Sequence, residues 1–392
     1  MIDFDKITPR RGTNCVKWDE TEADDVLPLW VADMDFEVAP AIQRALQQRV
    51  EHGVFGYTKV PDAYYDAVIR WFEGRHAWTI SREWILYTIG VVPAISCVIK
   101  ALTMPGDKVL IATPVYNCFF SCIRNNGCEV LESPLRINAK GKYEFDWKDF
   151  ERKCADEKTV AFLLCNPHNP GGRVWTRNEL IRIGDICHRH GVTVISDEIH
   201  NELVMPNYRY LPFASLSAEN EACSVTCISA SKSFNIAGLQ IANIVCADPA
   251  LRRRVDRAIN INEVCDVNPF GVVATIAAYE ESEDWLAELR KYISKNYKFL
   301  CKELLAIEGV GPVMPLEGTY LAWADCSELC QRLGVNVEQL EQLLIRDAGI
   351  YFNAGTHYGA VGEGFMRINL ACPRSILAEA LQRLARFVAA QS

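Results

Sequence analysis

Short apolar runs rich in β-branched residues alternate with helix-like segments through most of the first 250 residues, and this alternation constrains the fold more than any other feature. The runs cover residues 85–89, 108–113, 159–165, 192–197, 224–229 and 241–246. Between them lie stretches such as 177–190, where apolar residues are spaced among charged ones until Gly191 ends the helix. Strands separated by helices pair in parallel, so the sequence predicts an α/β fold with a mostly parallel sheet flanked by helices.

The last hundred residues follow a different pattern. They predict a long helix at 285–307, a strand at 319–324 and further helices at 337–348 and 375–389. Because 392 residues are many for one core, we expect a large domain at 49–283 and a smaller α+β domain at 284–392. The N-terminal segment, 1–48, is expected to pack with the small domain.

Charge and cysteine usage narrow the class of protein. A net charge of −9 and a pI near 5.4 argue against binding to nucleic acid or to an anionic membrane surface, which leaves small molecules as the expected partners. No signal peptide and no apolar run of membrane-spanning length is present, so we expect a cytoplasmic protein. The sixteen cysteines are scattered without zinc-site spacing, which predicts reduced core residues and no metal site.

Lys232 is the most informative single residue. It lies just past a predicted strand in the run Ser-Ala-Ser-Lys-Ser-Phe-Asn-Ile-Ala-Gly-Leu, residues 229–239. A partly desolvated lysine is a good Schiff-base former, and neighbouring hydroxyls can donate to a phosphate. Both features suit pyridoxal 5′-phosphate (PLP), whereas a solvated lysine in a serine-rich turn is the alternative.

Two segments carry a family resemblance. The run 229–239 resembles the cofactor-lysine motif of fold-type I PLP enzymes of the aspartate aminotransferase superfamily, which includes the class I/II aminotransferases. Residues 232–239 are most similar to the MalY/PatB-type cystathionine β-lyase (C–S lyase) branch, as is Pro-Leu-Trp-Val-Ala-Asp-Met-Asp-Phe at 28–36. The resemblance extends from there to residues 372–375 and implies a large PLP-binding domain in 49–283.

Asp197 is the candidate anion for the pyridine nitrogen, which must stay protonated for the ring to withdraw electrons. It ends the run 192–197, so it should lie at the carboxyl edge of the sheet, where α/β folds bind ligands. An isolated aspartate at this place more often caps a helix, but its spacing from Lys232 matches the family pattern. We add the nearby His200 to the predicted cofactor-binding set.

Other cofactor contacts are implied by the resemblance. Asn169, in Asn-Pro-His-Asn-Pro-Gly-Gly, matches the asparagine that binds the phenolic oxygen of PLP, although an ordinary turn has the same composition. The amides of Val91 and Val92 should hold the phosphate at a helix start, with help from the hydroxyls of Ser229 and Ser231.

The resemblance also assigns a catalytic ring, a partner contact and a substrate clamp. Tyr116 should stack on the cofactor, although an isolated tyrosine more often packs in the core. Tyr57 should reach the phosphate of a neighbouring subunit, which implies a homodimer with shared sites. Arg367 should bind the substrate carboxylate through two parallel hydrogen bonds, with a surface ion pair as the alternative. Gln240 departs from the family by replacing an arginine that often binds the phosphate.

The implied activity is a C–S β-lyase. Such an enzyme cleaves L-cystathionine or related cysteine S-conjugates to a thiol, pyruvate and ammonia through a Schiff base on Lys232. An amino-acid aminotransferase would use the same residues, and a PLP-binding regulatory protein is a third possibility. The preference for the lyase depends on the segments 28–36 and 232–239, which is an argument from analogy.

Overall fold

A mixed sheet forms the centre of the larger lobe. The computed structural model describes residues 2–21, 23 and 25–391, and within them this sheet has the strand order β2-β10-β9-β8-β7-β3-β4. Its strands are β2 (Ile85–Thr88), β3 (Lys108–Ile111), β4 (Glu129–Glu132), β7 (Thr159–Cys165), β8 (Thr193–Asp197), β9 (Ser224–Ile228) and β10 (Ala242–Val245). Among these described strands, β10 runs opposite to the other six, and it pairs antiparallel with β2 and β9. The expected mostly parallel sheet is confirmed.

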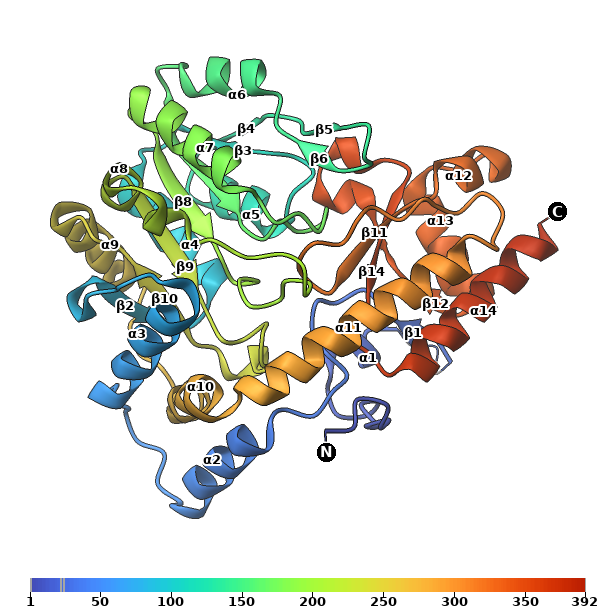
Figure 1. Ribbon diagram of the computed structural model, residues 1–392, viewed down its shortest axis with the longest axis horizontal. Coiled ribbons are helices and arrows are strands. Elements are labelled where there is room, and N and C mark those ends of the chain that lie inside the picture. The colour runs from blue at the N-terminus through green and yellow to red at the C-terminus, as the bar shows by residue number, and fades with distance from the viewer. Residues whose placement is uncertain (1, 22, 24, 392) are drawn as a thin grey trace.

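Helices cover both faces of this sheet (Figure 1). Contacts group α4 (Val91–Leu102), α5 (Cys118–Asn125) and α9 (Pro249–Ile261) on one face, and α6 (Trp147–Cys154), α7 (Arg177–Arg189) and α8 (Ala218–Ala222) on the other. Because both faces are covered, the inner strands are apolar almost without interruption, which explains the runs seen in the sequence. Thr176 and Glu179 form a capping box that starts α7.

Three further helices extend the larger lobe. They are α2 (Pro40–Glu51), α3 (Asp62–His76) and α10 (Pro269–Glu281). Helix α10 packs against both α2 and α3, so α2 contacts the larger lobe although most of it belongs to the predicted N-terminal segment, 1–48. The extended chain between α2 and α3 is mostly exposed, although Val60 is buried in the core.

The smaller lobe is built on a second sheet, with the strand order β11-β14-β13. These antiparallel strands are β11 (Leu321–Asp325), β13 (Asn353–Ala354) and β14 (Phe365–Asn369). Around them lie α11 (Glu283–Leu304), α12 (Ser327–Leu333), α13 (Val337–Leu343) and α14 (Arg374–Ala390), and the long α11 connects the two lobes (Figure 1). The N-terminal segment contributes α1 (Val16–Asp19) and β1 (Leu27–Pro28), and β1 pairs in parallel with β12 (Ile350–Tyr351).

The strand predictions were incomplete at one edge. All six predicted runs form strands of the large sheet, and β4 adds a seventh within the described residues. A two-stranded ribbon of β5 (Arg136–Ile137) and β6 (Tyr143–Glu144) was also not predicted. The domain boundaries stay a prediction. In the described part of the chain, no helix is long and apolar enough to cross a membrane, and no cluster of three or more metal-ligating side chains occurs.

Candidate active site

A cavity of about 470 Å³ lies between the two lobes, beside the carboxyl ends of β7 and β8. Residues of the large sheet, of the small sheet and of the N-terminal segment line it. Nine of the residues predicted from the sequence are among them: Val91, Val92, Tyr116, Asn169, Asp197, His200, Ser231, Lys232 and Arg367. Motifs that are more than 270 residues apart in the chain therefore share one cavity.

Lys232 enters the cavity from the loop that follows β9. Its Nζ donates to the carbonyl of Ala32 at 2.6 Å. Burial lowers the pKa of this amine, and the positive charge of Arg367 acts in the same direction, while the carboxylates of Asp33 and Asp197 oppose them. The lowered pKa increases the fraction of neutral amine, which is the nucleophilic form.

Asp197 is a buried carboxylate with no cation at ion-pair distance among the described residues. It is the last residue of β8, it is 3% exposed, and its Oδ1 accepts the N–H of Ile199 at 3.2 Å. Among the ion pairs of the described residues, none involves Asp197, and burial raises its pKa to about 7. A cationic ligand group at this carboxylate would remove the cost of burying its charge.

His200 lies in the same cavity as a neutral ring. Burial lowers its pKa to about 3, with further lowering by the charges of Lys232 and Arg367. Its Nδ1 is buried and has no hydrogen-bond partner within the described residues. The ring therefore keeps a polar atom available for a ligand.

Arg367 is held in place by both lobes and by the N-terminal segment. From β14 it donates through Nη1 to Asn169 Oδ1 at 3.3 Å and through Nη2 to the carbonyl of Trp30 at 2.6 Å. The guanidinium lies 4.8 Å from the centre of the Tyr358 ring. Its buried Nε has no partner in the described part of the chain, so the guanidinium keeps capacity for a carboxylate.

The start of α4 provides an anion-binding end to the cavity. The helix begins at Val91 directly after β2, its N-cap is Gly90 without a side-chain cap, and its first turn has no acidic residue. The first amides of a helix have no partner inside the helix, so they can donate to a phosphate. Ser231 and Gln240 line the same cavity.

Ser229 and Tyr57 are predicted site residues that do not line the cavity. The hydroxyl of Ser229 donates to the carbonyl of Ile241 at 2.7 Å and accepts the N–H of Ser231 at 3.1 Å, so it fixes the lysine loop. Tyr57 lies on the segment between α2 and α3 and is 100% exposed. Its predicted role concerns a neighbouring subunit, not this cavity.

Tyr116 lines the cavity beside a free thiol. Its hydroxyl oxygen accepts the S–H of Cys118 at 3.2 Å. Burial raises the pKa of Tyr116 well above its usual value, and Cys118 adds to the effect, so the phenol stays protonated near neutral pH. Its ring is therefore a neutral wall of the cavity.

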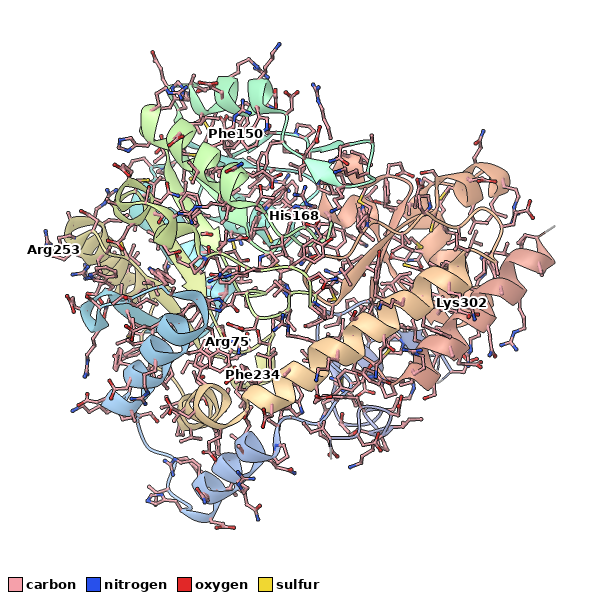
Figure 2. The ribbon with its side chains drawn as sticks, viewed as in Figure 1. Arg75, Phe150, His168, Phe234, Arg253 and Lys302 are labelled. Carbon is pink, nitrogen blue, oxygen red and sulfur yellow. The ribbon has the colours of Figure 1, made fainter. Side chains whose placement is uncertain are left out.

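Sequence reasoning missed several residues of the site. Trp30, Val31 and Ala32 line the cavity, although residues 28–36 had been used only as evidence of the family resemblance. Tyr358 also lines it, and this residue precedes a glycine-rich stretch without a motif. His168, from the Asn169 motif, lies near the junction of the lobes (Figure 2) but does not line the cavity. It is buried, and its pKa is lowered to about 3, mainly by burial.

The chemistry of these groups fits PLP. A half-buried lysine amine of lowered pKa can take up an aldehyde, an unpaired buried carboxylate suits a pyridinium nitrogen, and uncapped helix amides suit a phosphate. The three groups belong to one cavity.

Comparison with known proteins agrees with this geometry. The family "Aminotransferase class I and II" matches residues 24–384. Cystathionine beta-lyase PatB of Bacillus subtilis (strain 168) is 41% identical over 98% of this chain and 99% of its own. Protein MalY of Escherichia coli (strain K12) is 34% identical over 96% of each chain. The PLP-bound C–S lyase of Staphylococcus hominis, in complex with L-cycloserine, superposes with a TM-score of 0.92 at 32% identity over 99% of both chains. This chain therefore belongs to the class I and II aminotransferase family, in the branch that contains PatB and MalY.

Proposed function

We propose that this protein is a PLP-dependent carbon–sulfur β-lyase, which cleaves L-cystathionine or related cysteine S-conjugates to a thiol, pyruvate and ammonia. The similarity to PatB over nearly the full length of both chains carries the proposal. The cavity supports it, because it contains a lysine of lowered pKa, an unpaired buried carboxylate and an arginine with a free donor.

The cofactor contacts follow from the cavity walls. Bound PLP supplies an aldehyde for the substrate amine and a protonated ring that withdraws electrons from Cα. Asp197 would bind the ring nitrogen, and the amides of Val91 and Val92 would bind the phosphate with the Ser231 hydroxyl. Tyr116 would stack on the ring.

Two further side chains would orient the cofactor. Asn169 would bind its phenolic oxygen, and the amide Oδ1 of Asn169 is already oriented by Arg367. His200 stays neutral beside the positive charges of Lys232 and Arg367, so it adds no charge next to the cofactor ring.

The remaining steps belong to Lys232 and Arg367. Arg367 would hold the α-carboxylate of the substrate by charge-assisted hydrogen bonds, which orients the Cα–H bond. The Lys232 amine would then take the Cα proton, and the Cβ–S bond would break with release of the thiol. The three-carbon fragment that remains still carries the amino group, and it takes up one water to yield pyruvate and ammonia.

A homodimer with shared sites is part of this proposal. Tyr57, Val54 and Phe55 are more than half exposed on the segment between α2 and α3, although they are apolar or aromatic. In a dimer, Tyr57 would donate to the phosphate at the partner's site. Mixing Tyr57→Phe and Lys232→Ala chains should restore activity, because half of the sites in a mixed dimer carry neither change; no recovery would contradict the shared site.

A cytoplasmic location is also proposed. All sixteen cysteines are free thiols, and several are deeply buried, as is usual for proteins in a reducing compartment.

An aminotransferase is the second candidate. It is favoured by the PLP-bound putative aminotransferase from Clostridium difficile 630, which superposes with a TM-score of 0.95 at 41% identity over 99% of this chain and 100% of that chain. Both reactions need the same lysine, aspartate and arginine, so the products must decide between them.

The deciding experiment mixes PLP-loaded protein with L-cystathionine, without a 2-oxo acid, and follows pyruvate and free thiol together. The proposal predicts equal and sustained release of both. Activity that appears only when a 2-oxo acid is added would contradict the lyase and favour the aminotransferase. The matched control is Lys232→Ala, which should lose the visible absorption of bound cofactor and the activity.

A further inference from the structure

Backbone carbonyls of the N-terminal segment point at the side chains of the active site. We call residues 30–34 the strap, and its first three residues line the cavity. The carbonyl of Trp30 accepts from Arg367, and the carbonyl of Ala32 accepts from Lys232, both at 2.6 Å. The strap therefore contacts the expected base and the expected substrate clamp at once.

The small sheet fixes this strap by side chains that lie on neighbouring strands. Asn369 donates to the carbonyls of Val31 and Asp33, each at 2.6 Å. Tyr320, just before β11, donates its hydroxyl to the carbonyl of Ala32 at 2.8 Å. Because Leu321 is paired with Asn369 across β11 and β14, these two donors reach adjacent parts of the strap.

The carbonyl of Ala32 thus accepts two hydrogen bonds, one from Tyr320 and one from Lys232. A carbonyl oxygen has two lone pairs, so the tyrosine occupies one and the lysine the other. Tyr320 is fully buried, burial raises its pKa, and its ring contacts His200 edge to face, so it is a fixed and protonated donor.

Several charged or titratable groups face Lys232. They are Asp33 on the strap, Asp197 at the end of β8, Cys118 on α5, Arg367 on β14 and His200 after β8. These groups act through space, whereas the carbonyl of Ala32 contacts the amine directly at 2.6 Å. A change at this carbonyl should therefore act on both the direction and the protonation of the amine.

We propose that Tyr320 is a positioning residue for the lysine base: its hydroxyl fixes the Ala32 carbonyl, and that carbonyl holds one N–H of Lys232. With one N–H held, the lone pair of the neutral amine is directed away from the strap. The catalytic meaning of this arrangement rests on the proposed function, because only a lysine that removes a Cα proton needs a directed lone pair.

The variant Tyr320→Phe separates this role from simple packing. Without the tyrosine hydroxyl, the carbonyl can accept more strongly from a charged ammonium, so the amine should become harder to deprotonate. We expect the pH midpoint of Lys232 deprotonation to rise by about half a pH unit or more. In the PLP-loaded enzyme, kcat should fall about tenfold, because the Ala32 carbonyl is no longer fixed and the lysine that it holds is misdirected. The change in KM should be smaller, because Arg367, the substrate clamp, is intact.

The primary test uses the full chain without cofactor. Lys232 is labelled with acetic anhydride over a range of pH, and its acetylation is quantified by mass spectrometry. The matched control is Tyr64→Phe, which also removes a buried hydroxyl with one neutral acceptor, Asn243 Oδ1 at 2.9 Å, outside the cavity. A raised midpoint in Tyr320→Phe alone supports the proposal, whereas equal midpoints in all three proteins overturn it.

A second measurement tests the proposal even if Tyr320→Phe folds poorly. Replacing Tyr320 by 3-fluorotyrosine keeps the shape and makes the hydroxyl a stronger donor, so the midpoint should fall instead of rise. A midpoint that stays unchanged or rises would overturn the proposal. Since labelling needs neither cofactor nor turnover, a failure of the proposed lyase activity would leave this result intact and is distinguishable from it.

Discussion

Two buried carboxylates, five residues apart, have opposite environments. Asp197 and Glu202 are 3% and 2% exposed. Glu202 accepts from Trp71 Nε1 at 2.8 Å, Arg75 Nε at 3.0 Å and His76 at 2.6 Å. Asp197 forms no ion pair with any residue that the structure describes, and its Oδ1 accepts the backbone N–H of Ile199.

The pKa values follow this difference. Burial alone would raise both, but hydrogen bonds and charges from His76 and Arg75 lower the pKa of Glu202, whereas the pKa of Asp197 rises to about 7. Arg75, labelled in Figure 2, also pairs with Glu283 at the start of α11, so Glu202 belongs to the network that joins α3 to the rest of the molecule. We infer that Glu202 is a structural carboxylate, because the chain itself supplies its cationic partners. Asp197 forms no such pair, which suits a carboxylate that binds a ligand.

The largest effect is expected from Asp197→Asn in the loaded enzyme. The amide keeps the shape and removes the charge that holds the cofactor ring protonated, so turnover should fall on the order of a thousandfold. Pyruvate release from L-cystathionine measures it, with absorbance confirming bound cofactor. Rates near those of the wild type would remove Asp197 from this role.

The same substitution should stabilise the cofactor-free protein. A carboxyl group whose pKa is about 7 in the fold, against about 4 when unfolded, keeps its proton in the folded state after the unfolded chain has lost it. Stability therefore falls as the pH rises from about 4 to 8. Asp197→Asn should be the more stable protein at pH 8 by on the order of 3 kcal/mol, with the difference vanishing near pH 4. Urea unfolding at both pH values checks this, and parallel curves for the two proteins would refute it.

Glu202→Gln should act in the other direction and by a smaller amount. It leaves Arg75 and His76 without their buried anion, but Arg75 is partly exposed and keeps Glu283. We expect a loss of about 2 kcal/mol near neutral pH, with or without cofactor, and little change in kcat. Since the pKa of Glu202 is lowered in the fold, this loss should shrink as the pH falls below about 4. An unchanged unfolding midpoint would show that the network does not stabilise the fold.

How far the sequence predicts this molecule depends on the kind of interaction. The six buried strands carry continuous apolar runs, so they could be found, whereas β4 at the sheet edge has only Val130 and Leu131 between two glutamates and gives a weak signal. The antiparallel direction of β10 has no sequence signature, because direction is set by how the chain returns to the sheet.

The site shows the same division. Lys232, Asp197 and Asn169 stand in recognisable runs, and the structure brings them into one cavity. The strap contacts could not be predicted, because their acceptors are backbone carbonyls that any residue provides. Tyr320 has the same difficulty, since it continues an apolar run and its hydroxyl contacts only the backbone of residue 32.

The most direct test of the difference between Asp197 and Glu202 is the gain in melting temperature when PLP is added at pH 8. It is measured for the wild type and for Asp197→Asn. If the carboxylate is left unpaired for the cofactor, PLP should raise the melting temperature of the wild type clearly more than that of the variant, because only the wild type gains a partner for a buried charge. Equal gains in the two proteins would show that the Asp197 carboxylate does not pair with the cofactor.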